Sequence, residues 1–339
     1  MHLRLVLCAA LGLMALVGGP AHAADPTLGL VKKRGQVFCG VNGQLPGFSA
    51  PNDKKELAGF EVEFCHAIAA AVLGDAHKIK AIPLTAAKRF DALRSGEIDV
   101  LARNTSITLA RTAKTGVRDA VVLYIDGQAI VVPKKLGITA LVQIAGRKVC
   151  ALNGTPYVES LENWAESRKL AFTPVMFDTQ EQMYRAFYDG GCDALTQDIS
   201  AISTTIVAAG KGADYLVLPD IIEKHPLAAY VRAGDDAWLD VVRWTLFAML
   251  EAEELGVTQA NVDAQRHSGN PAVKRLLDGT ESGKLLGLDA NWVFNIIKQV
   301  GNYSEVYERD LGQYSTWKFP RAVNALWANG GVLHALPFR

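Results

Sequence analysis

The chain has 339 residues, of which half are hydrophobic and 21% are charged. Lysine plus arginine equals aspartate plus glutamate at 35 residues each. The chain therefore lacks the basic excess expected of a general nucleic-acid binder or a protein that binds anionic membranes. The composition is that of a globular protein, and the length favours two domains over one.

The first residues have the pattern of a secretory signal peptide. Arg4 precedes an apolar run from 5 to 17, and Ala21-His22-Ala23 then supplies small residues two positions apart. We predict cleavage after Ala23, which gives a signal peptide over 1–23 and an exported, periplasmic mature protein. The alternative is an uncleaved anchor, although the apolar run is short for a bilayer. Cys8 lies within that run, which argues against a lipoprotein.

Four cysteines remain after the signal peptide, and four cysteines allow three pairings. Their order favours Cys39–Cys65 and Cys150–Cys192, because the first member of each pair ends a short apolar strand and the second follows close behind. Export permits such bridges. A zinc site would usually need a CxxC spacing, which is absent, and four free buried thiols are the other alternative. No metal or other cofactor is predicted.

Strands and helices alternate after the signal peptide. Phe60, Phe64, Ile68 and Val72 recur every fourth residue, which predicts a helix over 60–73. The remaining elements expected in this part are strands at 35–42, 78–84 and 98–104, a loop over 43–59, and a short helix over 88–95 that ends at Gly96. This alternation predicts an α/β fold with a largely parallel sheet.

A second unit repeats the order of the first. It has expected strands at 146–154, 171–178 and 192–198, and expected helices at 157–169 and 179–188. Apolar strands at 127–135 and 226–236 flank this unit, and we interpret them as two crossovers between lobes. Lobe 1 would then hold 24–131 plus 229–339, and lobe 2 would hold 132–228. The alternative is one large domain, which the length disfavours.

The end of the chain is predicted to be helical. Residues 238–255 have helical apolar spacing, and two short helices are expected between 288 and 312. We expect Trp292, Phe294 and Tyr303 to lie in the core rather than to stack on a ligand.

Polar residues follow an apolar strand at 103–111. Strand ends of open α/β sheets are where ligands bind. Asn104, Ser106 and Thr108 carry short polar side chains, and Arg111 offers a planar fork that can pair with a carboxylate through two bonds. We interpret this stretch as an anion pocket, with a surface arginine and a capped turn as the alternative.

Two further segments offer complementary chemistry. Thr155 is a good helix N-cap and Pro156 suits the first helical position, so a helix N-terminus would attract an anion there. Asp198 ends the strand at 192–198 and would either pair with an ammonium group or cap the next helix. Taken together, Arg111, Ser106 and the Thr155 region would meet a carboxylate, and Asp198 an ammonium, so that a zwitterion closes the lobes.

The sequence resembles the polar amino-acid-binding proteins of ABC importers, in the general L-amino-acid-binding branch of solute-binding protein family 3. The resemblance covers essentially the whole mature chain. It is carried by stretches that include CGVNGQLPGFSAP, GFEVEFCHAIAAAV, RFDALRSGEIDVLARNTSITLAR, GRKVCALNGT, CDALTQD, DVVRWTLFAML and NWVFNIIKQVGNYSEVYER. It implies a two-lobed periplasmic binding protein of type II with two hinge strands.

The resemblance also implies roles for individual residues. Arg111 would bind the ligand carboxylate together with Asn104 and Ser106, and Asp198 would bind the ammonium. The four cysteines match those of this branch. Pro156 stands where relatives usually have threonine, which removes a backbone donor.

The ligand side chain would meet a different set of positions. Leu45 and Asn42 stand where many relatives place an aromatic ring and an acid. Arg89 lies where relatives line the side-chain pocket, and an arginine there would favour acidic or amide amino acids as ligands. The alternative is that Arg89 is a solvated residue on a helix.

The predicted function is capture of a free L-amino acid by a monomer that delivers it to the permease subunits of an ABC importer, with no nucleic-acid partner. An enzyme on the same fold, such as a cyclohexadienyl-type dehydratase, is the first alternative. The sequence offers no catalytic triad spacing, HExxH, Walker loop or dinucleotide fingerprint. A binding protein that serves a sensory receptor is the second alternative.

Overall fold

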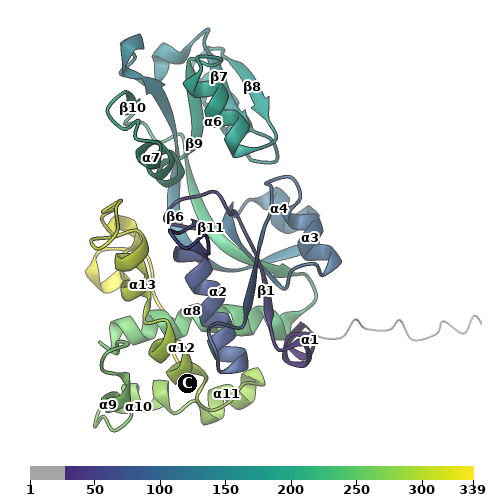
Figure 1. Ribbon diagram of the computed structural model, residues 1–339, viewed down its shortest axis with the longest axis vertical. Coiled ribbons are helices and arrows are strands. Elements are labelled where there is room, and N and C mark those ends of the chain that lie inside the picture. Colours follow the sequence, from purple (N-terminus) through teal and green to yellow (C-terminus); the bar gives the residue numbers. More distant parts are fainter. Residues whose placement is uncertain (1–26) are drawn as a thin grey trace, which may run out of the picture.

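The computed structural model describes residues 27–339, so the predicted signal peptide lies outside the described residues. Nine strands form one mixed sheet in the order β4-β1-β5-β11-β6-β9-β7-β8, with β10 paired to β6 (Figure 1). The strands of this sheet are β1 (Val37–Val41), β4 (Ile79–Pro83), β5 (Val100–Ser106), β6 (Val117–Pro133), β7 (Lys148–Leu152), β8 (Thr173–Phe177), β9 (Ala194–Asp198), β10 (Tyr215–Val217) and β11 (Glu223–Arg232).

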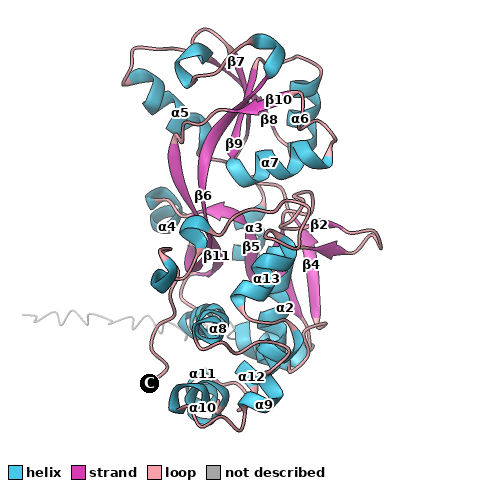
Figure 2. Ribbon diagram, turned by 90° about the vertical axis from the view of Figure 1, so that its left-hand side faces the viewer, coloured by secondary structure: helices cyan, strands magenta, loops and turns pink. Residues whose placement is uncertain are grey.

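The sheet consists of two parallel units joined by two long antiparallel strands. β4, β1 and β5 are parallel to one another, as are β8, β7 and β9. β6 and β11 pair antiparallel along their lengths, and β5 adds to β11 while β9 adds to β6. We call the β4-β1-β5 side lobe 1 and the β8-β7-β9 side lobe 2. Figures 1 and 2 show β6 and β11 as the strands that run between them.

The two crossover strands predicted at 127–135 and 226–236 correspond to β6 and β11, although both strands start earlier than expected. They are the two hinge strands of the type II fold. The exact division into lobes at 131/132 and 228/229 remains a prediction. In the segment expected to be a loop over 43–59, the structure adds a small hairpin of β2 (Ala50–Pro51) and β3 (Leu57–Ala58).

Helices cover the sheet in both lobes. α2 packs against β1 and β5 of lobe 1, and α8 and α12 pack against α2 (Figure 2). The helices of lobe 1 are α1 (Thr27–Arg34), α2 (Phe60–Leu73), α3 (Arg89–Ser95), α4 (Leu109–Lys114), α8 (Asp236–Glu254), α9 (Val262–Gln265), α10 (Pro271–Leu277), α11 (Thr280–Leu286), α12 (Trp292–Gln299) and α13 (Tyr303–Asp310). Those of lobe 2 are α5 (Tyr157–Glu166), α6 (Gln180–Tyr188) and α7 (Ile199–Ala208).

The apolar residues form a large and a smaller cluster mainly in lobe 1, and two further smaller clusters mainly in lobe 2. Trp292 and Tyr303 are fully buried in the large cluster, and Phe294 packs against it. These three aromatic residues are therefore core residues, as predicted. Within residues 27–339, no helix is both long and apolar enough to cross a membrane.

Both predicted disulfides are confirmed. Cys39 of β1 is bonded to Cys65 of α2, and Cys150 of β7 is bonded to Cys192, which lies just before β9. Each bond ties a helix or loop to the sheet of its own lobe, and neither crosses from one lobe to the other.

Candidate functional site

A small chamber lies where the polar ends of both lobes meet. Its free volume is about 10 Å³, which is close to the space needed by one water molecule. Six of the eight residues predicted to bind the ligand line it. The lining residues are Asn42, Arg89, Arg103, Asn104, Ser106, Arg111, Leu152, Thr155, Pro156, Tyr157, Gln180 and Gln197.

The end of β5 and the start of α4 place Arg111. The Thr108 side chain caps α4 by accepting from the Arg111 backbone N–H. This cap turns the chain so that the Arg111 side chain folds back along β5, where Nη1 donates to the Ser106 carbonyl at 2.6 Å. The guanidinium is largely buried, and burial lowers its pKa below the usual range.

Asn104 occupies a strained position on the same strand. Its φ is 23°, which is uncommon for a residue other than glycine. Two contacts hold it: Asn42 Nδ2 donates to Asn104 Oδ1 at 3.0 Å, and the Asn104 backbone N–H donates to the Glu61 carboxylate. Buried Glu61 of α2 was not predicted from the sequence. Burial raises its pKa to about 7, partly opposed by its bonds to Asn104 and Ser49 and by the charge of Arg103.

Three arginines line the chamber together. Arg89 starts α3 and donates from Nη2 to the Gly154 carbonyl at 3.0 Å, while its Nε has no partner among the described residues. Arg103 of β5 donates from Nε to the Leu84 carbonyl at 2.7 Å. Burial lowers the pKa of Arg103 to about 10 and that of Arg89 well below its usual range. The positive charges of the neighbouring guanidinium groups lower both pKa values further. The Glu61 charge beside Arg103 offsets part of the cost of burying these cations, and a bound anion would offset more.

The sequence analysis included Arg103 in the polar stretch 103–111 but gave it no role. It follows the apolar residues Val100, Leu101 and Ala102 on a strand predicted to be buried. An arginine in such a run signals a specific partner, because arginines are almost never fully buried unless paired.

The second lobe contributes the turn after β7. Here the predicted cap is wrong: α5 begins at Tyr157, Pro156 occupies the N-cap position, and no side chain caps the helix. Thr155 instead donates its hydroxyl to the Leu152 carbonyl at 2.6 Å. The hydroxyl is used to close the turn, so that the first N–H groups of α5 have no side-chain cap.

Gly154 brings the two lobes together. Its carbonyl accepts from Arg89 and, at 3.4 Å, from Arg111 Nη2. Its φ is +75°, and a Cβ there would lie 3.1 Å from the backbone nitrogen of Ala87 and 3.2 Å from the Ala86 carbonyl carbon. Glycine is needed here for both the conformation and the close approach. On the neighbouring edge, Gln180 Nε2 lies 3.4 Å from the Gln44 carbonyl and adds a second contact between lobes.

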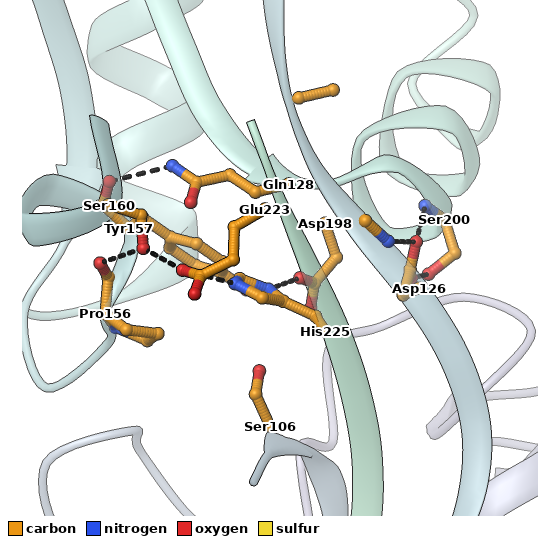
Figure 3. Close-up of polar contacts among 12 residues, drawn as sticks. Ser106, Asp126, Gln128, Pro156, Tyr157, Ser160, Asp198, Ser200, Glu223 and His225 are labelled. Atoms are coloured by element: carbon orange, nitrogen blue, oxygen red, sulfur yellow. Dashed lines mark hydrogen bonds and ion pairs between the residues drawn. The ribbon is translucent and has the colours of Figure 1, made fainter. Parts of the chain in front are cut away.

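Asp198 lies behind the chamber rather than in its wall. It is 1% exposed at the end of β9, and the His225 ring of β11 donates from Nδ1 to its Oδ1 at 2.6 Å (Figure 3). Its other oxygen, Oδ2, has no partner among residues 27–339. The alternative that Asp198 caps the following helix is wrong, because its side chain makes no cap hydrogen bond to α7.

The surroundings of Asp198 connect it to the chamber. Tyr157, which lines the chamber, stacks on His225 with ring centroids 5.3 Å apart. Burial and the charge of Asp198 together raise the pKa of Tyr157. Burial and the Asp198 charge also raise the pKa of Asp126 on β6 to about 7. Figure 3 shows the Ser106 hydroxyl directed towards Asp198 and His225 from the lobe 1 side.

His225 could not be picked out from the sequence as a site residue. Its partner is 27 residues away along the chain. The strand that carries it also lies next to β6 rather than β9 in the sheet. Nothing local in the sequence signals this contact.

Leu45 does not line the chamber. It is fully buried, and its backbone pairs with Ser49 in a tight turn whose Phe48 packs in the lobe 1 core. Asn42, three residues earlier, is therefore the part of this loop that reaches the chamber.

The chemistry of the chamber is that of binding. It presents guanidinium, amide and hydroxyl donors from one lobe and a turn, an aromatic ring and two glutamines from the other. Among residues 27–339, no group of three histidine, cysteine, aspartate or glutamate side chains is placed to hold a metal ion.

Comparison with known proteins agrees with this description. The model of the bacterial extracellular solute-binding proteins, family 3, matches residues 37–261. The general L-amino acid-binding periplasmic protein AapJ of Rhizobium johnstonii is 42% identical over 98% of this chain and 99% of its own. The glutamate/glutamine/aspartate/asparagine-binding protein BztA of Rhodobacter capsulatus is 41% identical over 96% of this chain and 97% of its own.

A solved structure extends the comparison to three dimensions. The periplasmic binding protein of an ABC transporter from Brucella ovis, with glutathione bound, is 44% identical and superposes with a TM-score of 0.90. The match covers 93% of this chain and 99% of that one. With its two-lobed sheet, two hinge strands and polar chamber, the chain belongs to the bacterial extracellular solute-binding proteins of family 3.

Proposed function

We propose that this protein captures a free L-amino acid with an acidic or amide side chain and delivers it to the permease subunits of an ABC importer. The observation that carries the proposal is the set of three buried arginines around one chamber, with the unpaired oxygen of Asp198 behind it. The relatives named for amino-acid binding support the same class of ligand.

In this proposal the two poles of the ligand meet opposite charges. Arg111, with Asn104 and Ser106, would bind the α-carboxylate, and the Thr155 turn would approach it from lobe 2. Asp198 would accept from the α-ammonium through Oδ2, with His225 holding the carboxylate in place through Oδ1. Charge-assisted bonds at both poles offset the loss of hydration.

Entry of the ligand requires the lobes to move apart. A chamber of about 10 Å³ is smaller than any amino acid, so that the contacts between Gly154 and the arginines must open and then re-form around the ligand. β6 and β11 would act as the hinge, with lobe 1 as 24–131 plus 229–339 and lobe 2 as 132–228. This is hinge closure around a ligand.

Arg89 and Arg103 determine the preferred side chain in this proposal. A second carboxylate would neutralise their charge, and an amide oxygen would accept their hydrogen bonds. The relative from Rhodobacter capsulatus carries the names of the two acids and the two amides. A neutral aliphatic side chain would leave both guanidinium groups with only their carbonyl partners, Gly154 and Leu84.

The cellular setting follows the relatives, which are periplasmic binding proteins. We propose that a signal peptide is removed after Ala23 and that the mature protein acts in the periplasm as a monomer. The relatives are named for binding, so we propose binding without turnover rather than a dehydratase activity.

A thermal-shift screen of the mature protein against the twenty amino acids tests this function. We expect glutamate, aspartate, glutamine and asparagine to raise the melting temperature, because a ligand at a hundred times its Kd stabilises the folded state by about 2.7 kcal/mol. The measurement is the midpoint with each ligand at millimolar concentration. If none of the twenty shifts the midpoint, amino-acid capture is rejected.

Replacing Arg89 with alanine should change selectivity rather than abolish binding. We expect the affinity for glutamate and aspartate to fall at least tenfold, about 1.4 kcal/mol, while affinities for neutral amino acids rise or stay within threefold. Titration calorimetry with glutamate, glutamine and leucine measures the change. Lys88→Ala is the matched control, because Lys88 is the adjacent exposed cation. An equal loss for all ligands would contradict a role for Arg89 in selection.

A further inference from the structure

We infer that Glu61, a buried acid behind the chamber wall, determines how strongly the protein prefers acidic over amide amino acids. Its negative charge would repel the side-chain carboxylate of a bound acidic ligand and would act much less on an uncharged amide. Glu61 is therefore a specificity-determining residue that lies outside the wall of the chamber. The inference rests on the proposed function, since it takes Arg89 and Arg103 as the partners of the ligand side chain.

Glu61 lies in the first turn of α2, where this helix packs against β5. It is 3% exposed, and both of its carboxylate oxygens have hydrogen-bond partners. Oε1 accepts from the Asn104 backbone N–H, and Oε2 accepts from the Ser49 hydroxyl at 3.3 Å. Ser49 Oγ in turn accepts from the Asn42 backbone N–H at 3.1 Å. The carboxylate is therefore fixed directly behind two residues of the chamber wall, Asn42 and Asn104.

A bulge in β5 brings Glu61 close to an arginine of the chamber. Residues 103–105 lie opposite a single residue of β11, because the register of this strand pair shifts there. Adjacent side chains of a regular strand point to opposite faces, and a bulge can redirect them. Arg103 and Asn104 are adjacent, yet both line the chamber. Since Glu61 holds the Asn104 N–H at this bulge, its negative charge lies near the Arg103 side of the wall.

The charges of Glu61 and Arg103 act on each other. Burial raises the pKa of Glu61 and lowers that of Arg103, and in each case the opposite charge of the other group counteracts the shift. Solvent screens an interaction between buried charges much less than one at the surface. A ligand carboxylate that binds Arg103 would therefore be repelled by Glu61. A ligand amide has no net charge and would not bear this cost.

The Glu61→Gln variant tests the inference through one ratio. A glutamine residue has nearly the shape of glutamate, and its amide can accept from the Asn104 N–H and donate to Ser49 Oγ. The variant therefore removes the charge while its side chain can keep both contacts. We expect the affinity for free glutamate, divided by the affinity for free glutamine, to rise at least fivefold, because only glutamate is repelled by the charge that is lost. Titration calorimetry with both ligands measures this ratio.

Two further variants are the controls. Glu63→Gln removes another acid of α2, whose carboxylate pairs with Arg309 at 3.1 Å, and it should leave the ratio within twofold of the native value. Glu61→Asp keeps the charge on a shorter side chain, so we expect both affinities to fall together and the ratio to stay within twofold. Equal losses for both ligands, or an unchanged ratio, in Glu61→Gln would reduce Glu61 to a structural role and overturn the inference. Failure of the native protein to bind either ligand would overturn the proposed function as well.

The native protein offers a second measurement that does not depend on how a variant folds. Burial raises the pKa of Glu61 to about 7, so the group is largely uncharged below that pH and charged above it. The side-chain carboxyl of free glutamate stays ionised from about pH 8.5 to about pH 5.5. We expect the ratio of the affinities for glutamate and glutamine to rise at least fivefold over this fall in pH. A ratio that stays constant would contradict the inference.

Other ionisable groups could contribute to this pH dependence. Arg103 of β5 and Asp198 of β9 act on the charge of Glu61, and Asp198 in turn interacts with His225 of β11 and Asp126 of β6. Burial and the Asp198 charge raise the pKa of Asp126 to about 7 as well. The Glu61→Gln variant separates these groups, since its ratio should change by less than twofold over the same pH range. A change in the variant as large as in the native protein would assign the effect to the other groups and overturn the inference.

Discussion

Replacing Arg111 with alanine should weaken amino-acid binding at least a hundredfold, or about 3 kcal/mol. Removing one partner of a buried, hydrogen-bonded charge pair costs about 2–5 kcal/mol, largely because the other charge is left without a partner. Arg111 is buried against Ser106 at the chamber wall, so water cannot replace it easily. Titration calorimetry with the best ligand from the screen measures the loss.

The lysine variant is the control for Arg111. Arg111→Lys keeps the charge but cannot form a planar, two-bond contact with a carboxylate. We expect its affinity to lie between those of the native protein and the alanine variant. Full affinity in Arg111→Ala, with the fold shown to be intact by circular dichroism, would exclude this residue from carboxylate binding.

Removing the second disulfide should strongly destabilise lobe 2. Cys150 and Cys192 are 42 residues apart, and the chain-entropy relation gives about 4 kcal/mol for a loop of this length. The bond joins β7 to the turn before β9 inside a small hydrophobic cluster. We therefore expect Cys150→Ser/Cys192→Ser to unfold at a much lower urea concentration than the native protein.

The first disulfide provides a comparison for this loss. Cys39 and Cys65 are 26 residues apart, for which the same relation gives about 3.5 kcal/mol. This bond lies inside the much larger core of lobe 1. Urea unfolding of both double variants, followed by tryptophan fluorescence and circular dichroism, measures the two losses. A midpoint for Cys150→Ser/Cys192→Ser equal to the native value would show that lobe 2 does not depend on its bridge.

Much of the fold could be predicted because its signals are local. The four-residue spacing of Phe60, Phe64, Ile68 and Val72 gave the bounds of α2 correctly, since helix length and apolar face are both set within that segment. The order of the cysteines favoured the pairing that the structure has. The hairpin of β2 and β3 was missed, because its two-residue strands are too short to show an alternating pattern.

The site could be predicted only in part, because some of its side chains bond to partners that are distant in sequence. Asn104, Ser106 and Arg111 reach the chamber because strand ends gather at one edge of a sheet. Thr155 and Asp198 were placed at helix starts, yet each uses its side chain elsewhere. Whether a hydroxyl or carboxylate caps a helix or bonds to a tertiary partner depends on neighbours that are distant in sequence. Arg103 and Glu61 were given no role because they lie in segments that otherwise resemble buried apolar elements.

Gly154 bears on the rate at which bound ligand dissociates from the protein. Because Gly154 has no Cβ, its α-carbon can approach the backbone of Ala86 and Ala87 while its carbonyl accepts from Arg89 and Arg111. A larger residue at this position would contact the Ala86–Ala87 backbone and keep the two lobes from closing fully. We therefore expect a residue larger than glycine at position 154 to raise the rate at which bound ligand dissociates.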